Sequence, residues 1–539
     1  MPYRPDQDQR TWSEIVRPAI RMVSLDGREI FILLVYTIAL GLVAAAVPLA
    51  SQILVNQAAF TGAAPPILAL SVIVLGVLLV GTFIRLFQIR VAALIAKRTF
   101  VRTALEGTRA LLDSPSQAYE FDDREVANRF FDVMTFQAAF SVLASEVLGV
   151  FVVSLVGIAI LAFYHPLFFS FSIVVALTCM LIIGFSAKQG VKRGTRRSTE
   201  KYRVAFWLSQ VAENRSMLRQ SDNNRIVHSM TDDLSTEYVR TYFDYLRLLL
   251  WQGGALFLIQ AFASAAFFGV GGWLVINGQL SLGQLVAAEI IVLSNMAALT
   301  RFYFYLDSFY ETVVAAGKIS QLTEANAGEP ERVAASKPAV IRGLTLTSGL
   351  LWEPLELKSG EVIALRGPSR RNCSVFLQRI AASDRLDDVT LKWNSDASIS
   401  RETAPDQVLF LARPAVLRMT LAENLSLLSD ADTLNAARST VLDNPLLRPS
   451  EKTDADHVLN DVEMSISDRA RYAVARTFMS NRPVVLIDMF FNLMEADDQI
   501  TFIREFKARF PDRILMINSF DTAIDPYITR AVKIRGTDA

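Results

Sequence analysis

Six apolar stretches, each long enough to cross a lipid bilayer, constrain the fold of this chain more than any other feature. A helix needs about 20 mostly apolar residues to span the hydrocarbon core. Runs of this kind occupy residues 30–53, 66–87, 141–163, 167–185, 256–276 and 285–304. With 52% of its 539 residues hydrophobic, the chain is too apolar for an ordinary soluble enzyme. We therefore predict a transmembrane domain of six helices over residues 30–324, after a cytoplasmic segment over residues 1–29.

The gaps between these stretches alternate between very short and very long. The short gaps, among them the pair His165 and Pro166 and the turn 277–279, contain no Lys or Arg, whereas the long gaps, about 88–140 and 186–250, are rich in both. Basic segments stay on the cytoplasmic side of a membrane, so we place the long gaps and both termini in the cytoplasm. Their helical periodicity predicts helices that continue out of the membrane. Some of their basic residues are also expected to contact anionic lipid head groups.

A change in composition marks the end of the membrane domain. Residues 325–337 (ANAGEPERVAASK) are small and polar and include Gly328 and Pro330, which predicts a linker. After it, short β-type runs at 362–365, 408–411, 484–487 and 514–517 are separated by helical patterns. Such alternation is typical of an α/β domain, which we place at residues 338–539.

Charge and cysteine content exclude several classes of function. Lys and Arg together equal Asp and Glu together, 54 each, so the net charge gives no argument for a nucleic-acid partner. Cys179 lies in an apolar run and Cys373 in what reads as a polar loop, and the three histidines are scattered. Two cysteines are too few for a disulfide framework or a multi-cysteine metal site. We predict neither a nucleic-acid partner nor a metal site.

Local sequence phrases resemble those of one known family, the exporter-type (type IV fold) ABC half-transporters. In the membrane half they are residues 121–130 (FDDREVANRF), the His165-Pro166 turn and residues 271–288 (GGWLVINGQLSLGQLVAA). In the soluble half they are residues 359–367 (SGEVIALRG), the segment from Pro414 to Asn424, residues 469–476 (RARYAVAR) and residues 484–488 (VVLID). The resemblance implies a six-helix ABC exporter domain followed by an α/β P-loop-type nucleotide-binding domain, the cassette.

The phosphate-binding loop of this family is degenerate here. Such a loop reads G-x-x-x-x-G-K-[ST], because backbone amides must wrap the phosphates and the Lys must neutralise them. Residues 367–374 read GPSRRNCS. Gly367 and Ser374 remain, but Arg370 replaces the family's middle Gly, Asn372 the last Gly and Cys373 the Lys. A neutral thiol cannot do the work of that Lys.

Two interpretations of this loop remain open at the level of sequence. Arg370 and Arg371 can supply positive charge beside the amide-rich start of a helix expected from Ser374. Alternatively, the segment is a solvated basic loop on a retained fold, and this is the interpretation we favour. We expect ATP and Mg²⁺ to bind in a dimer at most, and weakly or not at all to this chain.

The remaining catalytic positions of the family are also changed. Asp488 keeps the carboxylate that organises Mg²⁺, but the next residue, where the family has a Glu as the general base, is Met489. The Q-loop Gln position falls at Ala412 and the switch His position at Ser519. Phosphoryl transfer depends almost entirely on positioning and electrostatics. We predict that this cassette does not hydrolyse ATP by itself.

The signature sequence LSGGQ of the family becomes MSISD, residues 464–468. Ile466 places a branched side chain where amides should approach the γ-phosphate. The positions equivalent to the signature and its following Arg are Ser465, Ser467, Asp468 and Arg469. In this family each ATP site combines the P-loop of one chain with the signature of the other, so these changes also affect the site of any partner.

We predict from the resemblance that the chain is a subunit of an ABC-type exporter in the bacterial inner (cytoplasmic) membrane, working with a second half-transporter. A heterodimer is favoured over a homodimer, membrane lipids surround it, and the transported substrate is unidentified. Surfaces that couple cassettes to the membrane domain are expected at Ser114, Tyr119, Phe121, Arg215 and Asn223. The alternative is an ATP-independent transporter, scaffold or receptor on the same fold. A third hypothesis for the function is an active homodimeric ATPase.

Polar groups inside the spans are candidates for the substrate cavity. Burying such groups in lipid is costly, so they face a cavity or another helix. The candidates are Glu146, Gln260, Glu289 and Asn295. Hydrogen bonding between helices, without substrate contact, explains them equally well.

Overall fold

Two units make up the chain, Met1–Glu329 and Pro330–Ala539. This computed structural model describes residues 12–60, 64–113, 128–220, 224–323, 339–367, 369–381, 389–395, 399, 404–429, 438, 441–448, 451, 454–460 and 463–535. The predicted linker at 325–337 lies outside the described residues.

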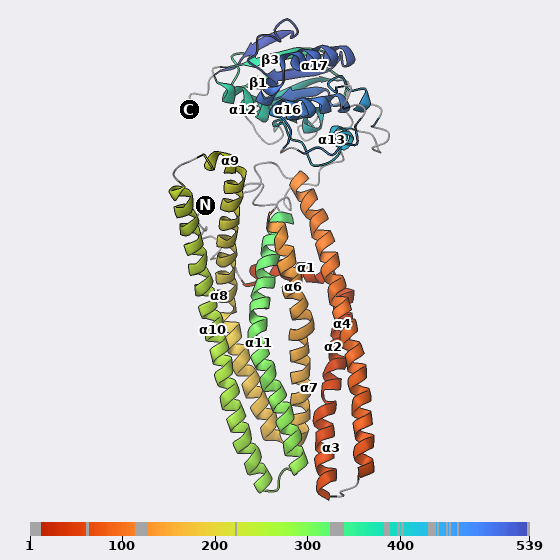
Figure 1. Cartoon of the computed structure of the whole chain (residues 1–539), viewed down its shortest axis with the longest axis vertical. Helices are drawn as coiled ribbons and strands as arrows, with labels where there is room; N and C mark the ends of the chain where they lie inside the picture. Colours follow the sequence, from red (N-terminus) through yellow and green to blue (C-terminus); the bar gives the residue numbers. More distant parts are fainter. Residues whose placement is uncertain are drawn as a thin grey trace. The chain divides into compact units, whose positions relative to one another are not determined.

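Helices alone form the described part of the first unit (Figure 1). Six stretches are long and apolar enough to span a membrane: Gly27–Gln57, Ile67–Leu112, Arg129–Tyr164, Pro166–Glu213, Arg225–Ile276 and Leu282–Leu322. The elements are α1 (Trp12–Ser24), α2 (Gly27–Ala44), α3 (Ala46–Phe60), α4 (Ala64–Asp113), η2 (Arg129–Phe131), α6 (Asp132–Val142), η3 (Leu143–Val147), α7 (Leu148–Tyr164), α8 (Pro166–Glu213), α9 (Arg215–Leu218), α10 (Arg225–Ile276) and α11 (Leu282–Thr323). The prediction of six spans is confirmed.

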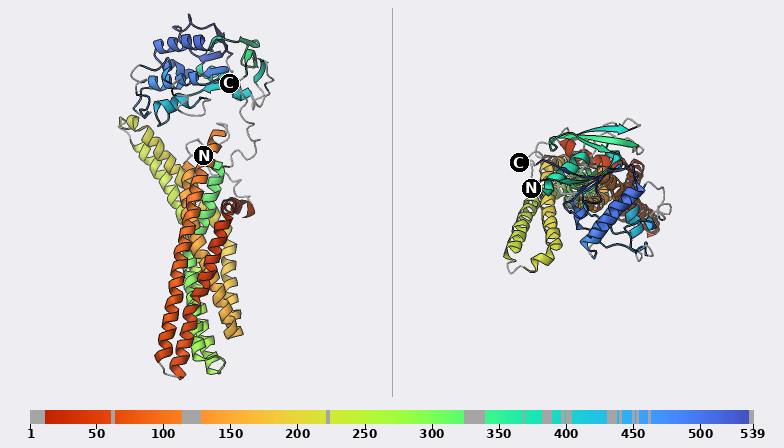
Figure 2. Two further views of the ribbon diagram at one scale, coloured as in Figure 1. Left: turned by 90° about the vertical axis from the view of Figure 1, so that its right-hand side faces the viewer. Right: turned by 90° about the horizontal axis from the view of Figure 1, so that it is seen from above.

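Three of these helices are far longer than a bilayer requires. Helices α4, α8 and α10 have 50, 48 and 52 residues. At a rise of 1.5 Å per residue, each is about 70–80 Å long, against about 30 Å for the hydrocarbon core. Figure 2 shows α8 and α10 running side by side to α9 at their shared end. More than half of each helix must therefore lie outside the bilayer, as the long gaps predicted.

The first span is broken in its middle. Helix α2 ends at Ala44 and helix α3 begins at Ala46. Pro48 has no backbone N–H to donate to the carbonyl of Ala44, and its ring crowds that carbonyl. The break between α2 and α3 lies at this position.

The short turns are closed by local hydrogen bonds. At the end of α10, Gly278 has a φ of 68°, its N–H donates to Val275 O, and the N–H of Gln279 donates to Leu274 O. This is a Schellman arrangement, in which Gly supplies the left-handed residue. Ser281 and Gln284 then exchange bonds of 2.9 and 3.1 Å between side chain and backbone, which starts α11 with a capping box.

Gln252 of α10 ties three helices of the bundle together. Its side chain is fully buried, and its Nε2 donates to Ser186 Oγ of α8 at 2.6 Å and to Tyr310 Oη of α11 at 2.7 Å. The ring of Tyr310 lies directly on Gly190 of α8, where a β-carbon would overlap it. Buried polar groups need such partners. These contacts therefore fix how α8, α10 and α11 pack against one another.

The second unit contains two sheets. An antiparallel sheet has the order β2-β1-β4, and a parallel sheet has the order β5-β6-β7-β3-β8. The strands are β1 (Ile341–Ser348), β2 (Leu355–Lys358), β3 (Val362–Arg366), β4 (Val389–Ser395), β5 (Val408–Leu411), β6 (Val484–Ile487), β7 (Ile514–Asn518) and β8 (Arg530–Lys533). The helical elements are α12 (Arg370–Ala381), η4 (Ala404–Gln407), α13 (Leu421–Ser426), α16 (Ile466–Ala475), η5 (Arg476–Met479), η6 (Met489–Leu493) and α17 (Ala496–Arg509).

The central strands of the parallel sheet, β6, β7 and β3, are buried on both faces. Val484 and Leu486 of β6 pack in one cluster with apolar residues of β1, β2 and α12, whereas Val485 and Ile487 pack in another with those of α13, α16 and α17. Alternate residues of a strand point to opposite faces. A strand covered on both sides is therefore apolar throughout, which is why the predicted run 484–487 has no polar residue.

The Gly190 contact gives a test of the bundle. We expect Gly190→Ala to destabilise the protein by about 1–3 kcal/mol, because the new methyl group has no room beside the Tyr310 ring. Gly184→Ala on the same helix is the control, since nothing lies within 4 Å of a β-carbon there. The measurement is the thermal unfolding midpoint in detergent. A midpoint for Gly190→Ala equal to that of Gly184→Ala would contradict the packing.

Candidate functional site

The residues predicted to form the nucleotide site lie at the carboxyl ends of three neighbouring parallel strands. Gly367 follows β3, Asp488 follows β6, and Asn518 is the last residue of β7. Because β6, β7 and β3 are adjacent, these residues meet at one edge of the sheet. Ligands of open α/β sheets bind at this edge.

Three side chains form a closed hydrogen-bonded cluster at this edge. Ser374 Oγ donates to Asp488 Oδ1 at 2.6 Å, and Asn518 Nδ2 donates to the same oxygen at 2.7 Å. Asn518 Nδ2 also lies 3.1 Å from Ser374 Oγ. The two residues that would hold Mg²⁺ therefore bind each other. Sequence reasoning missed Asn518, although it directly precedes the predicted switch position.

The loop after β3 is shorter than the sequence suggested. Helix α12 begins at Arg370 and not at Ser374. Ser369 caps it, because the N–H of Asn372 donates to both Ser369 O and Ser369 Oγ, at 3.2 and 3.3 Å. Asn372, in place of a flexible Gly, has a buried side chain that bonds Ser369 Oγ at 2.9 Å. The amide of Asn372, which a phosphate-binding loop would turn toward a phosphate, is thus already used.

Cys373 is buried and not part of a polar loop, which corrects the expectation from sequence. Its side chain is fully buried within α12, and a β-carbon on Gly367 would lie 3.1 Å from its Sγ. Burial, and then the carboxylate of Asp488, raise the pKa of the Cys373 thiol to about 11. The group at the Lys position is therefore neutral at physiological pH and carries no positive charge for phosphates.

Arg370 and Arg371 are both exposed. The Arg370 guanidinium carbon lies 5.4 Å from the centre of the Phe520 ring, a cation–π distance. The backbone O of Arg370 is 3.4 Å from Asn518 Nδ2. The structure therefore places positive charge near the cluster, on flexible side chains and not on a fixed Lys.

The positions of the missing catalytic residues hold no proton acceptor suited to activating water. Met489 is 41% exposed, and only its backbone N–H contacts Asp488, donating to Oδ1 at 2.7 Å. Ser519 is fully buried and donates to Asn492 Oδ1 at 2.7 Å. Ala412 follows β5 and is exposed. Neither a thioether, a methyl group nor a bonded hydroxyl replaces a positioned carboxylate.

One face of the exposed Trp352 ring is covered by the chain itself. Trp352 lies between β1 and β2, and the guanidinium carbon of Arg535 is 4.1 Å from its ring centre. The N–H of Arg535 donates to Leu350 O at 2.9 Å, and Arg535 O lies 3.4 Å from Asn372 Nδ2. This contact occupies one face of the ring that a nucleotide base would need for stacking.

The signature-equivalent segment caps its own helix. Ser465 is the N-cap of α16, where its Oγ accepts from the Asp468 N–H at 3.0 Å and donates to Asp468 Oδ2 at 2.7 Å. A carboxylate in the first turn of a helix is favourable for the helix. It is unfavourable for a phosphate approaching the same N-terminus. Ser467 and Arg469 are half-buried beside it.

Arg471 holds this segment in place through a buried ion network. Its side chain is 1% exposed. It donates to both carboxylate oxygens of Glu451, at 2.6 and 2.8 Å, and to Asp468 Oδ1 at 2.8 Å. Its Nε lies 3.8 Å from Asp498 Oδ2. Sequence reasoning assigned the helix 469–476 to the family but not this role of Arg471.

The ion network is expected to make the cassette sensitive to acid. Burial, the largest single effect, would raise the pKa of Glu451 and of Asp468, but hydrogen bonds from Arg471 and other neighbours, together with the positive charge of nearby arginines, outweigh it and lower both. Carboxylates with lowered pKa stabilise the folded state above their unfolded pKa of about 4, and this contribution is lost as the pH falls through the folded values. Burial raises the pKa of Asp498. Its contribution to the stability of the folded state therefore has the opposite dependence on pH.

We therefore expect Arg471→Met to destabilise the protein by about 3–5 kcal/mol at neutral pH, because it leaves buried carboxylates uncompensated. The loss should shrink below about pH 4, where these carboxylates are protonated. Thermal unfolding of the full chain over a pH series measures both effects. Arg504→Met, at a side chain that is 65% exposed, is the matched control and should change little. A loss for Arg471→Met that does not vary with pH would contradict the network.

The residues at this site differ from those that hold ATP and Mg²⁺ in a phosphate-binding loop. The Lys position is a buried neutral thiol, the last Gly position is a buried amide side chain, and the metal-binding pair is closed on itself. Among the described residues no group of three or more His, Cys, Asp or Glu is placed to hold a metal ion.

The polar candidates within the spans are not brought together. Gln260 lies on α10, and Glu289 and Asn295 lie on α11, where the amide of Asn295 packs on Gly157 of α7. Glu146 lies in η3, which is a π-helix, and is paired with Arg85 of α4, with Nη2 to Oε1 at 2.6 Å. Sequence reasoning missed Arg85, although its charge falls inside the predicted span 66–87.

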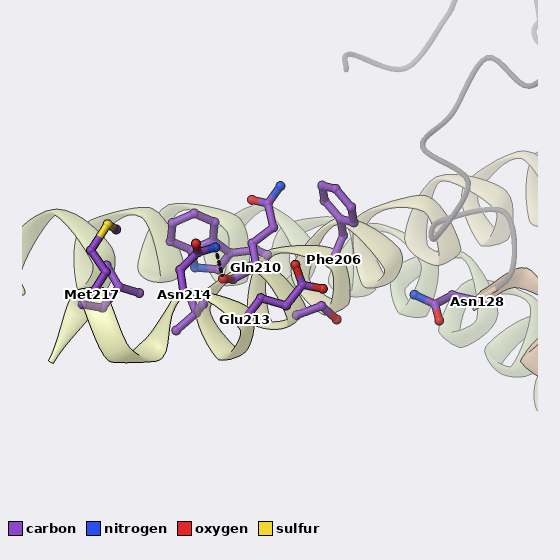
Figure 3. A pocket seen from close by; sticks show the side chains of 10 residues that line it. Asn128, Phe206, Gln210, Glu213, Asn214 and Met217 are labelled. Carbon is purple, nitrogen blue, oxygen red and sulfur yellow. Dashed lines mark hydrogen bonds between the residues drawn. The ribbon is translucent and has the colours of Figure 1, made fainter. Parts of the chain in front are cut away.

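A hollow of about 750 Å³ lies at one end of α8 (Figure 3). Its lining includes Phe206, Gln210, Asn214 and Met217, and Asn214 Nδ2 donates to Gln210 O at 2.8 Å. The helix α9 that begins with Arg215 follows directly, so the hollow lies at one of the predicted coupling regions. The other residues predicted for coupling, Ser114, Tyr119, Phe121 and Asn223, lie outside the described residues.

Comparisons with known proteins agree with this architecture. A family model described as the ABC transporter transmembrane region matches residues 30–299, which is half of the chain. A sequence comparison with curated proteins found no match. The fold is similar to that in a solved structure of a bacterial Atm1-family ABC exporter with ATP bound, with 13% identity, a TM-score of 0.74, and coverage of 95% of this chain and 94% of that one. At this identity the likeness shows the fold alone. The chain is thus an integral membrane protein with the fold of an ABC exporter, and it belongs to the ABC transporter transmembrane region family.

Proposed function

We propose that this chain is a subunit of an ABC exporter whose own cassette does not hydrolyse ATP and which works with a second half-transporter. The observation that carries the proposal is the closed cluster of Ser374, Asp488 and Asn518 beside a buried Cys373. The groups that should meet phosphate and Mg²⁺ are satisfied by one another.

The size of the expected loss follows from what such groups contribute in other enzymes. Removing one preorganised donor from a site of developing charge costs about 10²–10³ in rate. This cassette has no Lys at Cys373, no Glu at Met489 and no His at Ser519. The contributions of these three groups do not simply add. Asp488 is retained, but without the three groups it has no bound phosphate on which to act.

A partner is needed for two reasons. The side chain of Arg85, within the second span, is 57% exposed in the single chain, and a charge of this kind does not face lipid. Moreover, two copies of this chain would carry two equally impaired sites. We therefore propose a heterodimer, with this chain contributing half of the membrane domain and a modified signature segment. The basic long segments support a cytoplasmic location for the cassette and both termini.

The first test is the activity of the chain alone. In nanodiscs without a partner, we expect phosphate release from ATP at the background rate, because the site has neither a base nor a fixed cation. Asp488→Asn should leave that rate unchanged. A fluorescent ATP analogue should bind with a Kd weaker than about 1 mM, the upper end of ordinary KM values. Turnover above background that Asp488→Asn abolishes would refute the proposal, provided that the variant unfolds at the wild-type temperature.

The second test is pairing. Co-expression with a half-transporter encoded beside this chain should yield a complex in which ATP hydrolysis appears, and substitution of the partner's own Walker B Glu should abolish it. Asp488→Asn in this chain should reduce the activity much less. Isolation of a homodimer only would contradict the heterodimer. Transport that persists after ATP depletion and collapses with the proton gradient would instead favour an ATP-independent transporter on this fold.

A further inference from the structure

A cluster of charged side chains lies at one level of the membrane unit. Measured along the helix axis, Arg85 lies about 32 Å from the first residue of α4, and Arg301 lies about 29 Å from the first residue of α11. Glu146 lies about 27 Å from the last residue of α7. These helix ends are at the short turns, so all three groups lie close to the opposite boundary of an approximately 30 Å hydrocarbon core. By the positive-inside argument this is the cytoplasmic leaflet.

Glu146 is held from two sides. Arg85 Nη2 lies 2.6 Å from its Oε1, and the Tyr305 hydroxyl donates to its Oε2 at 3.3 Å. The glutamate is part of the π-helix η3, Leu143–Val147, between α6 and α7. Single π-turns within α-helices occur mostly at functional sites, because they redirect a side chain at a cost to the helix. Helices α4, α7 and α11 are thus joined at this point.

Arg301 adds a second positive charge without a counter-ion. It lies one turn before Tyr305 on α11 and therefore shares its face. It is exposed, and within the described part of the chain it makes no ion pair or hydrogen bond. The set Arg85, Glu146 and Arg301 has a net charge of one positive unit. A cation without a counter-ion near the boundary of the hydrocarbon core is available to an anionic group of a substrate or ion.

The surroundings of the two arginines are apolar. Ile89, one turn after Arg85 on α4, is 54% exposed, and Phe304, three residues after Arg301, is 64% exposed. A guanidinium binds carboxylate or phosphate with two parallel hydrogen bonds. A ligand that satisfies both features has a negative head group and an apolar body.

We propose that Arg85, Glu146, Arg301 and Tyr305 form a recognition site for the anionic head group of an amphiphilic substrate, entered at the level of the cytoplasmic leaflet. The proposal rests on the exporter function proposed above. Arg301 supplies the free positive charge, and Arg85 supplies the second guanidinium. Because Glu146 neutralises the charge of Arg85, the site suits a head group of low negative charge. Tyr305 positions Glu146.

The test is equilibrium binding of radiolabelled dodecyl phosphate to the full chain in phosphatidylcholine nanodiscs, without nucleotide or partner. Wild-type protein should bind it saturably. Arg301→Gln should weaken binding about tenfold, the usual effect of losing one charge-assisted hydrogen bond. Glu146→Gln should tighten binding by a similar factor, because it releases Arg85. Arg90→Gln, an exposed arginine of α4 outside the cluster, should bind as wild type.

Two results would overturn the proposal. If Arg301→Gln and Arg90→Gln weaken binding equally, the ligand is attracted to the basic surface in general and not to this site. Weakening by Glu146→Gln would show that the cluster only holds the helices together, since a structural role predicts loss for every variant.

Competitors identify the occupant. If inorganic phosphate competes as strongly as unlabelled dodecyl phosphate, the proposal of an amphiphilic substrate is overturned. Competition by phosphatidylglycerol would support that proposal and extend the possible ligands to membrane lipids. Because the measurement uses neither ATP nor a partner, its failure leaves the proposed heterodimer untouched. Conversely, failure to find a partner leaves the binding result standing.

Discussion

The structure depends first on the absence of water from the hydrocarbon core. Every backbone N–H and C=O there must be bonded within the chain, and a helix achieves this by itself. Once a helix has formed, continuing it costs little, and α4, α8 and α10 run on for 50, 48 and 52 residues. The exception lies at Ala44, where Pro48 removes a donor and the helix restarts. The short turns end their helices with Gly278 and Pro166, which local sequence specifies.

In the cassette, the residues that stabilise the fold are mostly different from those at the predicted nucleotide site. The parallel sheet is held by apolar side chains on both faces. The fold therefore does not depend on the Lys, the Glu and the signature glycines that the family resemblance leads one to expect. The vacated polar groups are then paired with one another: Ser374 with Asp488 and Asn518, and Ser465 with Asp468. Unpaired buried polar groups cost free energy, so a site without its ligand becomes stable by closing.

The membrane unit shows the opposite situation. Gln252 is buried and its Nε2 donates to both Ser186 and Tyr310, as expected of a group that holds helices together. Arg85 and Arg301 are exposed near one boundary of the spans, and the second has no counter-ion in the described chain. Charges in such a position are available to an anionic group. Structural and recognition roles of polar residues in the spans are thus distinguished by their pairing and exposure.

The sequence alone determined the six spans, the long helices, the turns at His165 and Gly278 and the α/β character of the second unit, because each follows from local periodicity and turn chemistry. It also predicted which catalytic groups are missing. Tertiary structure decided what replaced them: the start of α12 at Arg370, the burial of Cys373, the bond from Asn518 to Asp488 and the pairing of Arg85 with Glu146, 61 residues apart. These features join residues distant in sequence, so no local pattern specifies which side chains meet.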